Sequence, residues 1–251
     1  MLSAEFIPLA AVVLLGAVMQ RVAGMGFALV VAPFTVLLFG PLQGVVIVNA
    51  CGVVCAATLW AITRERIDRR RLLRLALLTP VGAAAGVGVL MIVDPAALYL
   101  VIGVTVLVAL AATLGLQRVA YILPDGWTTT SLTGLATGAL VSISGVGGPP
   151  LTAYALLTRW EQRSFAATMQ PLTVIISSIA LIAGVLVPGA APELSVVEVT
   201  VLLASIGIGS AIAVPVGGLV SARVARVLVI VVAALGAVSI LVRGVMAFAG
   251  G

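Results

Sequence analysis

The residues best suited to chemistry lie in one short segment, Ser142 to Pro150, in the middle of an otherwise apolar chain. The segment reads Ser-Ile-Ser-Gly-Val-Gly-Gly-Pro-Pro, and a run so rich in glycine and proline cannot continue a helix. Inside a bilayer, non-helical backbone persists only where protein or a water-filled cavity covers it. Such a break exposes backbone amides and the positive end of the next helix, which together can bind an anion. The alternative is that the small residues serve only tight helix packing.

A shorter segment of the same kind, Ala23 to Phe27, lies in the first half of the chain and reads Ala-Gly-Met-Gly-Phe. At an offset of 121 residues, three pairs of similar residues align: Gly24 with Gly145, Gly26 with Gly147, and Asn49 with Gln170. Paired helix breaks in corresponding positions of two halves indicate the substrate site of a transporter.

Several polar side chains accompany these breaks. Arg21 lies three residues before Gly24, and its guanidinium would suit a sulfite, sulfonate or carboxylate unless the side chain extends to the membrane interface. Asn49 and Gln170 are isolated amides, which bind a substrate or bridge helices. The predicted substrate-binding residues are Arg21, Gly24, Gly26, Asn49, Ser142, Ser144, Gly145, Gly147, Gly148, Pro149 and Gln170.

The composition is that of an integral membrane protein. Hydrophobic residues make up 63% of the 251 residues and charged residues 8%, against about 25% charged in soluble domains. The 13 basic residues are all arginine, and apart from Arg21 and Arg243 they lie in or beside short loops, which favours a role in membrane orientation over nucleic-acid binding. The chain has no histidine, so it lacks the commonest general base and a usual ligand of haem and zinc. We expect no enzymatic activity, no cofactor and no bound metal.

The elements that must position these residues form an all-α polytopic fold. Residues 1–251 are predicted to make one transmembrane domain of about ten hydrophobic segments, grouped in two repeats, 6–117 and 127–248. Each repeat is expected to open with a helical hairpin folded about its glycine break, over 6–39 and 127–158. The predicted segments are 6–20, 24–39, 42–63, 72–93, 97–117, 127–144, 149–158, 165–187, 196–221 and 226–248.

The arginines predict the orientation of these segments. The run from Arg64 to Arg71 is expected to be a cytoplasmic loop, since arginine and lysine favour the cytoplasmic side. Counting crossings from it places both termini outside and gives the two halves opposite orientations, as in a 5+5 inverted repeat. In the later segments the offset becomes 127 residues, and Gly82 aligns with Gly209.

Two further features bear on mechanism. Cys51 and Cys55 lie four residues apart, and they are either packing residues or a redox-active pair. No aspartate or glutamate is expected at mid-span, so the usual acids of a proton relay are absent. An anion leaving a cell that is negative inside gains about 2.3 kcal/mol per charge per 100 mV, so export needs no coupling ion.

The whole pattern resembles the TauE/SafE family of sulfite and sulfonate exporters, also called TSUP. The resemblance rests on Gly24 to Phe27, on Ser144 to Leu157 and on Arg163 to Phe165. The first-half motif lacks the fuller glycine run that is common in the family, since Phe27 and Ala28 follow it. The resemblance implies movement of small sulfur-containing anions or organosulfonates across a bacterial inner membrane.

The predicted function is therefore export of a small anion, such as sulfite or an organosulfonate, by alternating access. The expected partners are that anion and the lipid bilayer, with no nucleic acid, and self-association is left open. Two alternatives remain: a thiol-redox membrane protein using Cys51 and Cys55, and a membrane subunit that does not itself transport.

Overall fold

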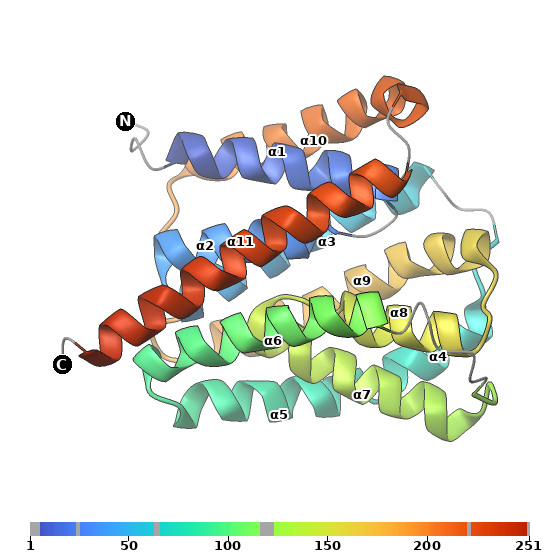
Figure 1. The fold of residues 1–251 in the computed structure, drawn as a ribbon, viewed down its shortest axis with the longest axis horizontal. Helices are drawn as coiled ribbons and strands as arrows, with labels where there is room; N and C mark the ends of the chain where they lie inside the picture. The colour runs from blue at the N-terminus through green and yellow to red at the C-terminus, as the bar shows by residue number, and fades with distance from the viewer. Residues whose placement is uncertain (1–5, 24–25, 63–65, 116–122, 220–221, 250–251) are drawn as a thin grey trace.

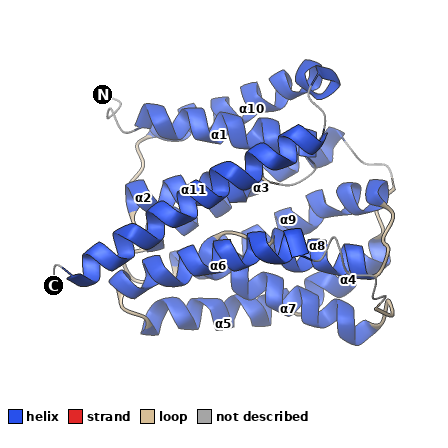
Figure 2. Ribbon diagram, in the orientation of Figure 1, coloured by secondary structure: helices blue, strands red, loops and turns tan. Residues whose placement is uncertain are grey.

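The computed structural model describes residues 6–23, 26–62, 66–115, 123–219 and 222–249, and every regular element in these ranges is an α-helix (Figure 2). The all-α prediction is therefore confirmed for the described residues. In chain order the helices are α1 (Phe6–Ala23), α2 (Phe27–Phe39), α3 (Pro41–Ile62), α4 (Arg69–Leu77), α5 (Thr79–Ile92), α6 (Pro95–Gly115), α7 (Trp127–Ser144), α8 (Gly148–Leu157), α9 (Gln162–Val185), α10 (Val196–Leu219) and α11 (Ala222–Ala249).

The structure differs from the sequence prediction around the arginine-rich run. Helix α4 already begins at Arg69, because Asp68 caps it by accepting a hydrogen bond of 3.0 Å from the Arg71 amide. The predicted segment 72–93 is divided between α4 and α5, at Leu78. Pro80 explains the division: it stands in the first turn of α5, and because it has no N–H it cannot donate to the Ala76 carbonyl as a continuous helix would require.

Several helices are suited to crossing a membrane. Among the described residues, five stretches are long and apolar enough: Pro41–Ile62, Arg69–Ile92, Gln162–Val185, Val196–Pro215 and Val227–Ala249. Shorter apolar helices cover Phe6–Val22, Phe27–Phe39 and Ala96–Ala111. Together these stretches make a multi-pass membrane protein.

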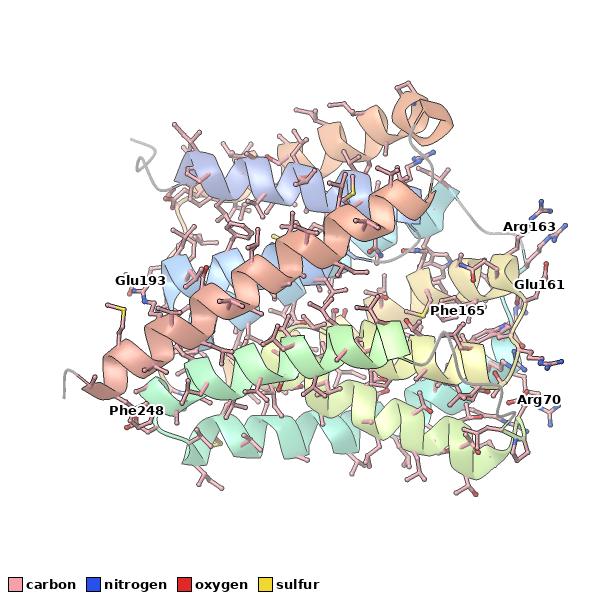
Figure 3. All side chains as sticks on the ribbon, viewed as in Figure 1. Arg70, Glu161, Arg163, Phe165, Glu193 and Phe248 are labelled. Carbon is pink, nitrogen blue, oxygen red and sulfur yellow. The ribbon has the colours of Figure 1, made fainter. Side chains whose placement is uncertain are left out.

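The helices lie side by side along the long axis of the molecule (Figure 1). The N-terminus and the C-terminus lie at the same end of the bundle (Figure 1). Figure 3 shows Arg70, Glu161 and Arg163 at the opposite end, while Glu193 and Phe248 lie near the termini. The arginine-rich loops and the termini thus occupy opposite ends, which are the two ends that would face opposite sides of a membrane.

The helices of the two halves pack against each other. Helix α1 packs on α10 and α7 packs on α5, while α3 contacts α9 and α6 contacts α11. Two glycines allow the closest approaches: a Cβ added at Gly209 of α10 would lie 2.5 Å from the Leu14 carbonyl oxygen, and one added at Gly82 of α5 would lie well inside 3.0 Å of the Leu135 carbonyl oxygen. Any side chain at either position would force the helices apart.

A cluster of polar and aromatic residues at the arginine-rich end ties α4 and α8 to the loop that precedes α7. Arg71 donates to Asp125 from Nε at 3.0 Å and from Nη2 at 2.8 Å, and the Tyr154 hydroxyl donates to the same carboxylate at 2.5 Å. The Arg71 guanidinium also lies 4.7 Å from the centre of the Trp160 ring. We call these four residues the Arg71 cluster.

The Arg71 cluster predicts acid-sensitive stability. Partial burial alone would raise the pKa of Asp125, but hydrogen bonds from Tyr154 and Arg71 outweigh it and hold that pKa below its ordinary value. A depressed carboxyl pKa stabilises the fold above the unfolded value of about 3.9 and loses that contribution as the pH falls through the folded value. We expect Asp125→Asn to lower the melting temperature at pH 7, and the gap to wild type to close below about pH 4. A gap that is constant across pH would mean that the carboxylate charge does not stabilise the fold.

Candidate functional site

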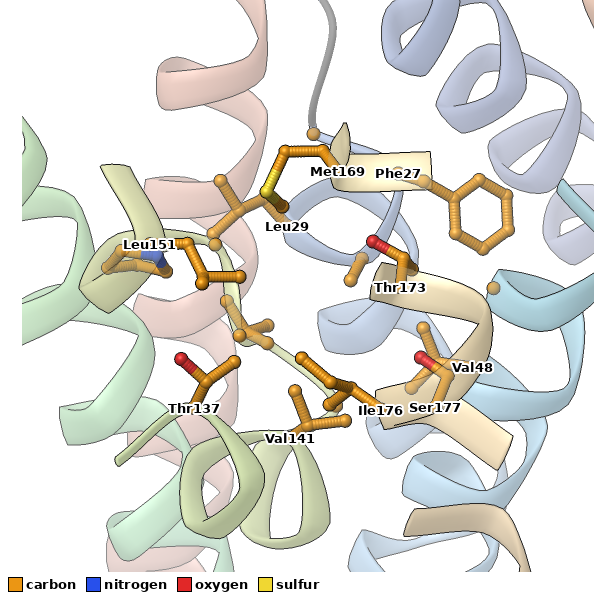
Figure 4. Close-up of a pocket in the computed structure, with 18 of the residues that line it drawn as sticks. Phe27, Leu29, Val48, Thr137, Val141, Leu151, Met169, Thr173, Ile176 and Ser177 are labelled. Atoms are coloured by element: carbon orange, nitrogen blue, oxygen red, sulfur yellow. The ribbon is translucent and has the colours of Figure 1, made fainter. Parts of the chain in front are cut away.

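A cavity of about 90 Å³ lies between α2, α3, α7, α8 and α9. It is larger than the roughly 10–15 Å³ that a single buried water needs, so it can hold a small ligand. Figure 4 shows Thr137 and Val141 of α7 on one wall, with Thr173 and Ser177 of α9 on another. Most of the wall is apolar, and none of the described residues that line it is charged. A ligand in this cavity would meet backbone amides and neutral side chains.

Two helices begin at the cavity. Helix α2 starts at Phe27 after Gly26, and α8 starts at Gly148 after Gly147, and these four residues all line the cavity. Neither glycine can supply a side-chain cap. The Phe27 amide is taken by Gln20, and the two prolines that follow Gly148 have no N–H. The first-turn amides left for a ligand are therefore those of Ala28 and Leu29 in α2 and of Gly148 in α8. A helix N-terminus carries about half a positive charge, and two of them together offer about one charge to an anion. The cavity is therefore electrostatically suited to a small anion, although no cationic side chain of the described residues lines it.

The local sequence explains the break between α7 and α8. Gly145 ends α7 in the left-handed region, with φ of +74°, and its amide donates to the Val141 carbonyl at 2.8 Å. Pro149 and Pro150 occupy the first turn of α8, which suits residues that lack an N–H. Gly26 has φ of +134°, a conformation that residues with a side chain rarely adopt. Glycine is thus required on both sides of the cavity by backbone geometry.

Gln20 of α1 links the two halves at the cavity wall. Its Oε1 accepts a hydrogen bond of 3.1 Å from the Phe27 amide, and its Nε2 donates to Gln170 Oε1 at 3.5 Å. The side chain is 7% exposed and lines the cavity. Sequence reasoning did not select Gln20, although an isolated buried amide beside Arg21 was a signal that could have found it.

The structure brings together five of the predicted substrate-binding residues. These five line the cavity: Gly26, Gly145, Gly147, Gly148 and Pro149. A sixth, Gln170, is buried and reaches the cavity through its hydrogen bond with Gln20. Gly24 lies outside the described residues.

The other predicted side chains do not line the cavity. Arg21 donates from Nη1 to the Ser210 carbonyl of α10 at 3.4 Å. Asn49 donates from Nδ2 to the carbonyls of Val45 and Val141, at 2.9 and 3.3 Å. Ser144 donates to Leu140, and the buried Ser142 hydroxyl has no hydrogen-bond partner among the described residues.

Several cavity residues were absent from the sequence prediction. They are four hydroxyl side chains and one methionine on α7, α8 and α9: Thr137, Thr152, Met169, Thr173 and Ser177. The last three recur every four residues along α9, and this helical spacing was the signal that could have found them. Thr137 and Thr152 each donate to a carbonyl of their own helix, at 2.7 and 2.9 Å. A hydroxyl that donates in this way can still accept, so the Thr137 oxygen can meet a donor in the cavity.

Cys51 and Cys55 are buried free thiols in the core of α3. Buried cysteines of this kind usually act as small apolar packing residues. We expect the double substitution Cys51→Ala and Cys55→Ala to leave transport within about twofold of wild type and to lower stability by about 1 kcal/mol per site. Loss of transport with the melting temperature unchanged would favour the thiol-redox alternative.

The chain was compared with known proteins. No curated protein and no solved structure matches it. A family model described as sulfite exporter TauE/SafE matches residues 9–242, a range that contains both helix breaks and the whole cavity. With nearly its full length matched, and with glycine-opened helices at the cavity where the family motifs stand, the chain belongs to the sulfite exporter TauE/SafE family.

Proposed function

We propose that this chain exports a small anion, sulfite or an organosulfonate, and that the anion binds in the cavity between the N-termini of α2 and α8. The single observation that carries the proposal is the meeting of these two N-termini at a cavity of ligand size. Family membership supports a transporter of the sulfite or sulfonate type and gives no support to an enzyme.

The electrostatics of the cavity favour an anion with about one negative charge over a more highly charged one. An unpaired ion in an apolar site carries a large desolvation cost, and about one unit of positive charge from two helix ends offsets part of it. Binding is then strong enough for selection and weak enough for release. Arg21 is proposed to hold α1 on α10 and not to contact the substrate, because its guanidinium donates to the Ser210 carbonyl.

We further propose that the chain is a 5+5 inverted repeat, with residues 6–117 and 127–248 as the two repeats. The helix contacts support this, because exchanging the halves turns the α1–α10 contact into α7–α5 and the α2–α11 contact into α8–α6. Residue contacts support it too: Gly209 faces Leu14 and Gly82 faces Leu135, and these pairs are related by the offsets of 127 and 121 found in the sequence.

Alternating access follows from such a repeat. The glycine-opened hairpins α1–α2 and α7–α8 would meet near the midplane, and rocking of one half against the other would expose the cavity to each side in turn. No carboxylate of the described residues lines the cavity, which supports transport without a proton relay. An inside-negative potential would then drive the anion outward.

We also propose a location in the bacterial inner membrane, with the arginine-rich end cytoplasmic and both termini outside. The gathering of Arg70 and Arg163 at the end opposite the termini supports this orientation under the positive-inside rule (Figure 3). The apolar side chains that remain exposed on α10 and α11 would face lipid or a second copy of the chain.

The experiment that tests the function is efflux of labelled sulfite, sulfoacetate and taurine from proteoliposomes that contain the purified protein. We expect saturable efflux of at least one anionic substrate, accelerated by an inside-negative potential. Taurine, which carries no net charge at neutral pH, serves as the control for potential dependence. Folded protein that moves none of the three would favour the alternative of a non-transporting subunit.

A further inference from the structure

A second and larger cavity lies away from the proposed substrate site, at the arginine-rich end of the bundle. Its volume is about 620 Å³, within the roughly 300–1,000 Å³ that ligand pockets span. It is bounded by Ala57 and Trp60 of α3, by Leu72 and Leu73 of α4, and by Pro171 of α9. The residue that sets its chemistry is Arg69, the only charged residue among the described ones that line it.

The walls of this cavity are open to the surroundings of the bundle. Trp60 is 40% exposed and Leu73 is 69% exposed, so large apolar surfaces lie at the opening. In a membrane protein such surfaces face lipid, and tryptophan is typical of the boundary between the hydrocarbon core and the head groups. The cavity therefore lies where an acyl chain can enter it from the bilayer.

Among the described residues, none is paired with the Arg69 guanidinium, which can therefore bind an anion from outside the chain. Within the described residues Arg71 is paired with Asp125, and Arg74 lies over the Trp127 ring, whereas Arg69 has no acidic partner there. Arg69 is exposed in the first turn of α4, directly after Asp68, whose carboxylate is turned to the Arg71 amide that it caps. No carboxylate of the described residues lines the cavity, so an anionic group that enters it would meet the Arg69 guanidinium without a competing negative charge on the wall.

We propose that this cavity binds an anionic phospholipid of the leaflet at the arginine-rich end, with the phosphate on Arg69 and an acyl chain along Trp60, Leu72 and Leu73. Basic pockets between transmembrane helices recognise lipid head groups by the same combination of charge and apolar wall. A basic residue near a charged membrane surface contributes about 1 kcal/mol, so loss of Arg69 should weaken binding about fivefold. The site is separate from the anion cavity, and its occupation does not depend on the transported substrate.

Trp60 makes the proposal directly testable. Bromine atoms on an acyl chain quench the fluorescence of a tryptophan that they touch. Subtracting the fluorescence of Trp60→Phe from that of wild type gives the signal of Trp60, free of the signals of Trp127 and Trp160. The purified protein in detergent is titrated with dibrominated phosphatidylglycerol and, separately, with dibrominated phosphatidylcholine. We expect the Trp60 signal to be quenched at about fivefold lower concentration by the anionic lipid.

Two substitutions separate a specific site from diffuse attraction. Arg69→Gln should abolish the preference for phosphatidylglycerol, whereas the matched control Arg70→Gln should keep it, because Arg70 does not line the cavity. The proposal would be overturned if the two lipids quenched Trp60 equally in wild type. It would also be overturned if Arg69→Gln and Arg70→Gln lost the preference for phosphatidylglycerol to the same extent. Failure of either lipid to quench Trp60 would also overturn it and would favour a second copy of the chain as the cover of this cavity.

Discussion

Replacing Gly147 with leucine is expected to reduce anion efflux by about ten- to a hundredfold while the protein still folds. A Cβ at this position would lie within 3.0 Å of side-chain carbons of Val141 and Thr137, and the rest of the leucine would extend into the anion cavity. Overpacking of a filled site costs about 1–3 kcal/mol, and 1.4 kcal/mol corresponds to a tenfold change in binding. Proteoliposome efflux checks the prediction.

The control for Gly147→Leu must show that a leucine in place of glycine does not by itself stop transport, and the melting temperature of Gly147→Leu must show that this variant folds. Gly88→Leu provides the first control, because a Cβ at Gly88 would have no neighbour within 4 Å beyond its own helix among the described residues. We expect this variant to transport like wild type. If Gly147→Leu retained more than half of wild-type efflux, the break between α7 and α8 would not be the substrate site.

The second large effect is on stability. Gly82→Ala is expected to destabilise the fold by about 3 kcal/mol, because its methyl group would lie against the Leu135 carbonyl oxygen and would separate α5 from α7. Gly209→Ala should act in the same way on α10 and α1, through the Leu14 carbonyl. Denaturant unfolding of the purified variants in detergent measures the free energy of unfolding of each, and the difference from wild type gives the loss of stability.

Each of these variants has a matched control on its own helix. Gly88→Ala in α5 and Gly207→Ala in α10 would add a methyl group to open space, so they should be neutral or stabilise by up to about 1 kcal/mol. Similar losses of unfolding free energy for Gly82→Ala and Gly209→Ala would support the inverted repeat, since the repeat relates the two positions. A large loss at one site and none at the other would argue that the halves pack differently.

The fold was largely predictable because its signals are local and strong. Long apolar runs interrupted by charge, glycine or proline predict helices and their ends. The missed division at Leu78 shows the limit of such counting, because Pro80 lies within a continuous apolar run that was interpreted as one segment. The early start of α4 depends on one cap, Asp68, whose effect is local geometry and not composition.

The candidate site was predictable where it consists of backbone. Gly26 and Gly145 could be found because a turn of the chain with positive φ at a helix break favours glycine, and Gly147 could be found because it belongs to the same glycine-rich run. Side chains were harder, because adjacent residues on a helix point about 100° apart and packing decides which one faces the cavity.

This ambiguity affected three helices in the same way. The cavity is lined by the neighbour of a predicted residue in each case: Gln20 beside Arg21, Val48 beside Asn49, and Val141 beside Ser142. In each pair the second residue is the more polar one, so the sequence favours it as the ligand-binding residue. Tertiary packing instead turns the first residue toward the cavity. The sequence alone holds no measure of that rotation in an apolar helix, because lipid and protein are equally apolar neighbours.

The most direct test of anion binding between the two helix N-termini is equilibrium binding of labelled sulfite to the purified protein, compared among wild type, Gly147→Leu and Arg21→Gln. Binding there would not use Arg21, whose guanidinium contacts α10. We therefore predict that Gly147→Leu loses saturable binding, whereas Arg21→Gln binds within about threefold of wild type, a change of less than 1 kcal/mol. Loss of binding in a folded Arg21→Gln protein, with binding retained in Gly147→Leu, would contradict binding at the helix N-termini.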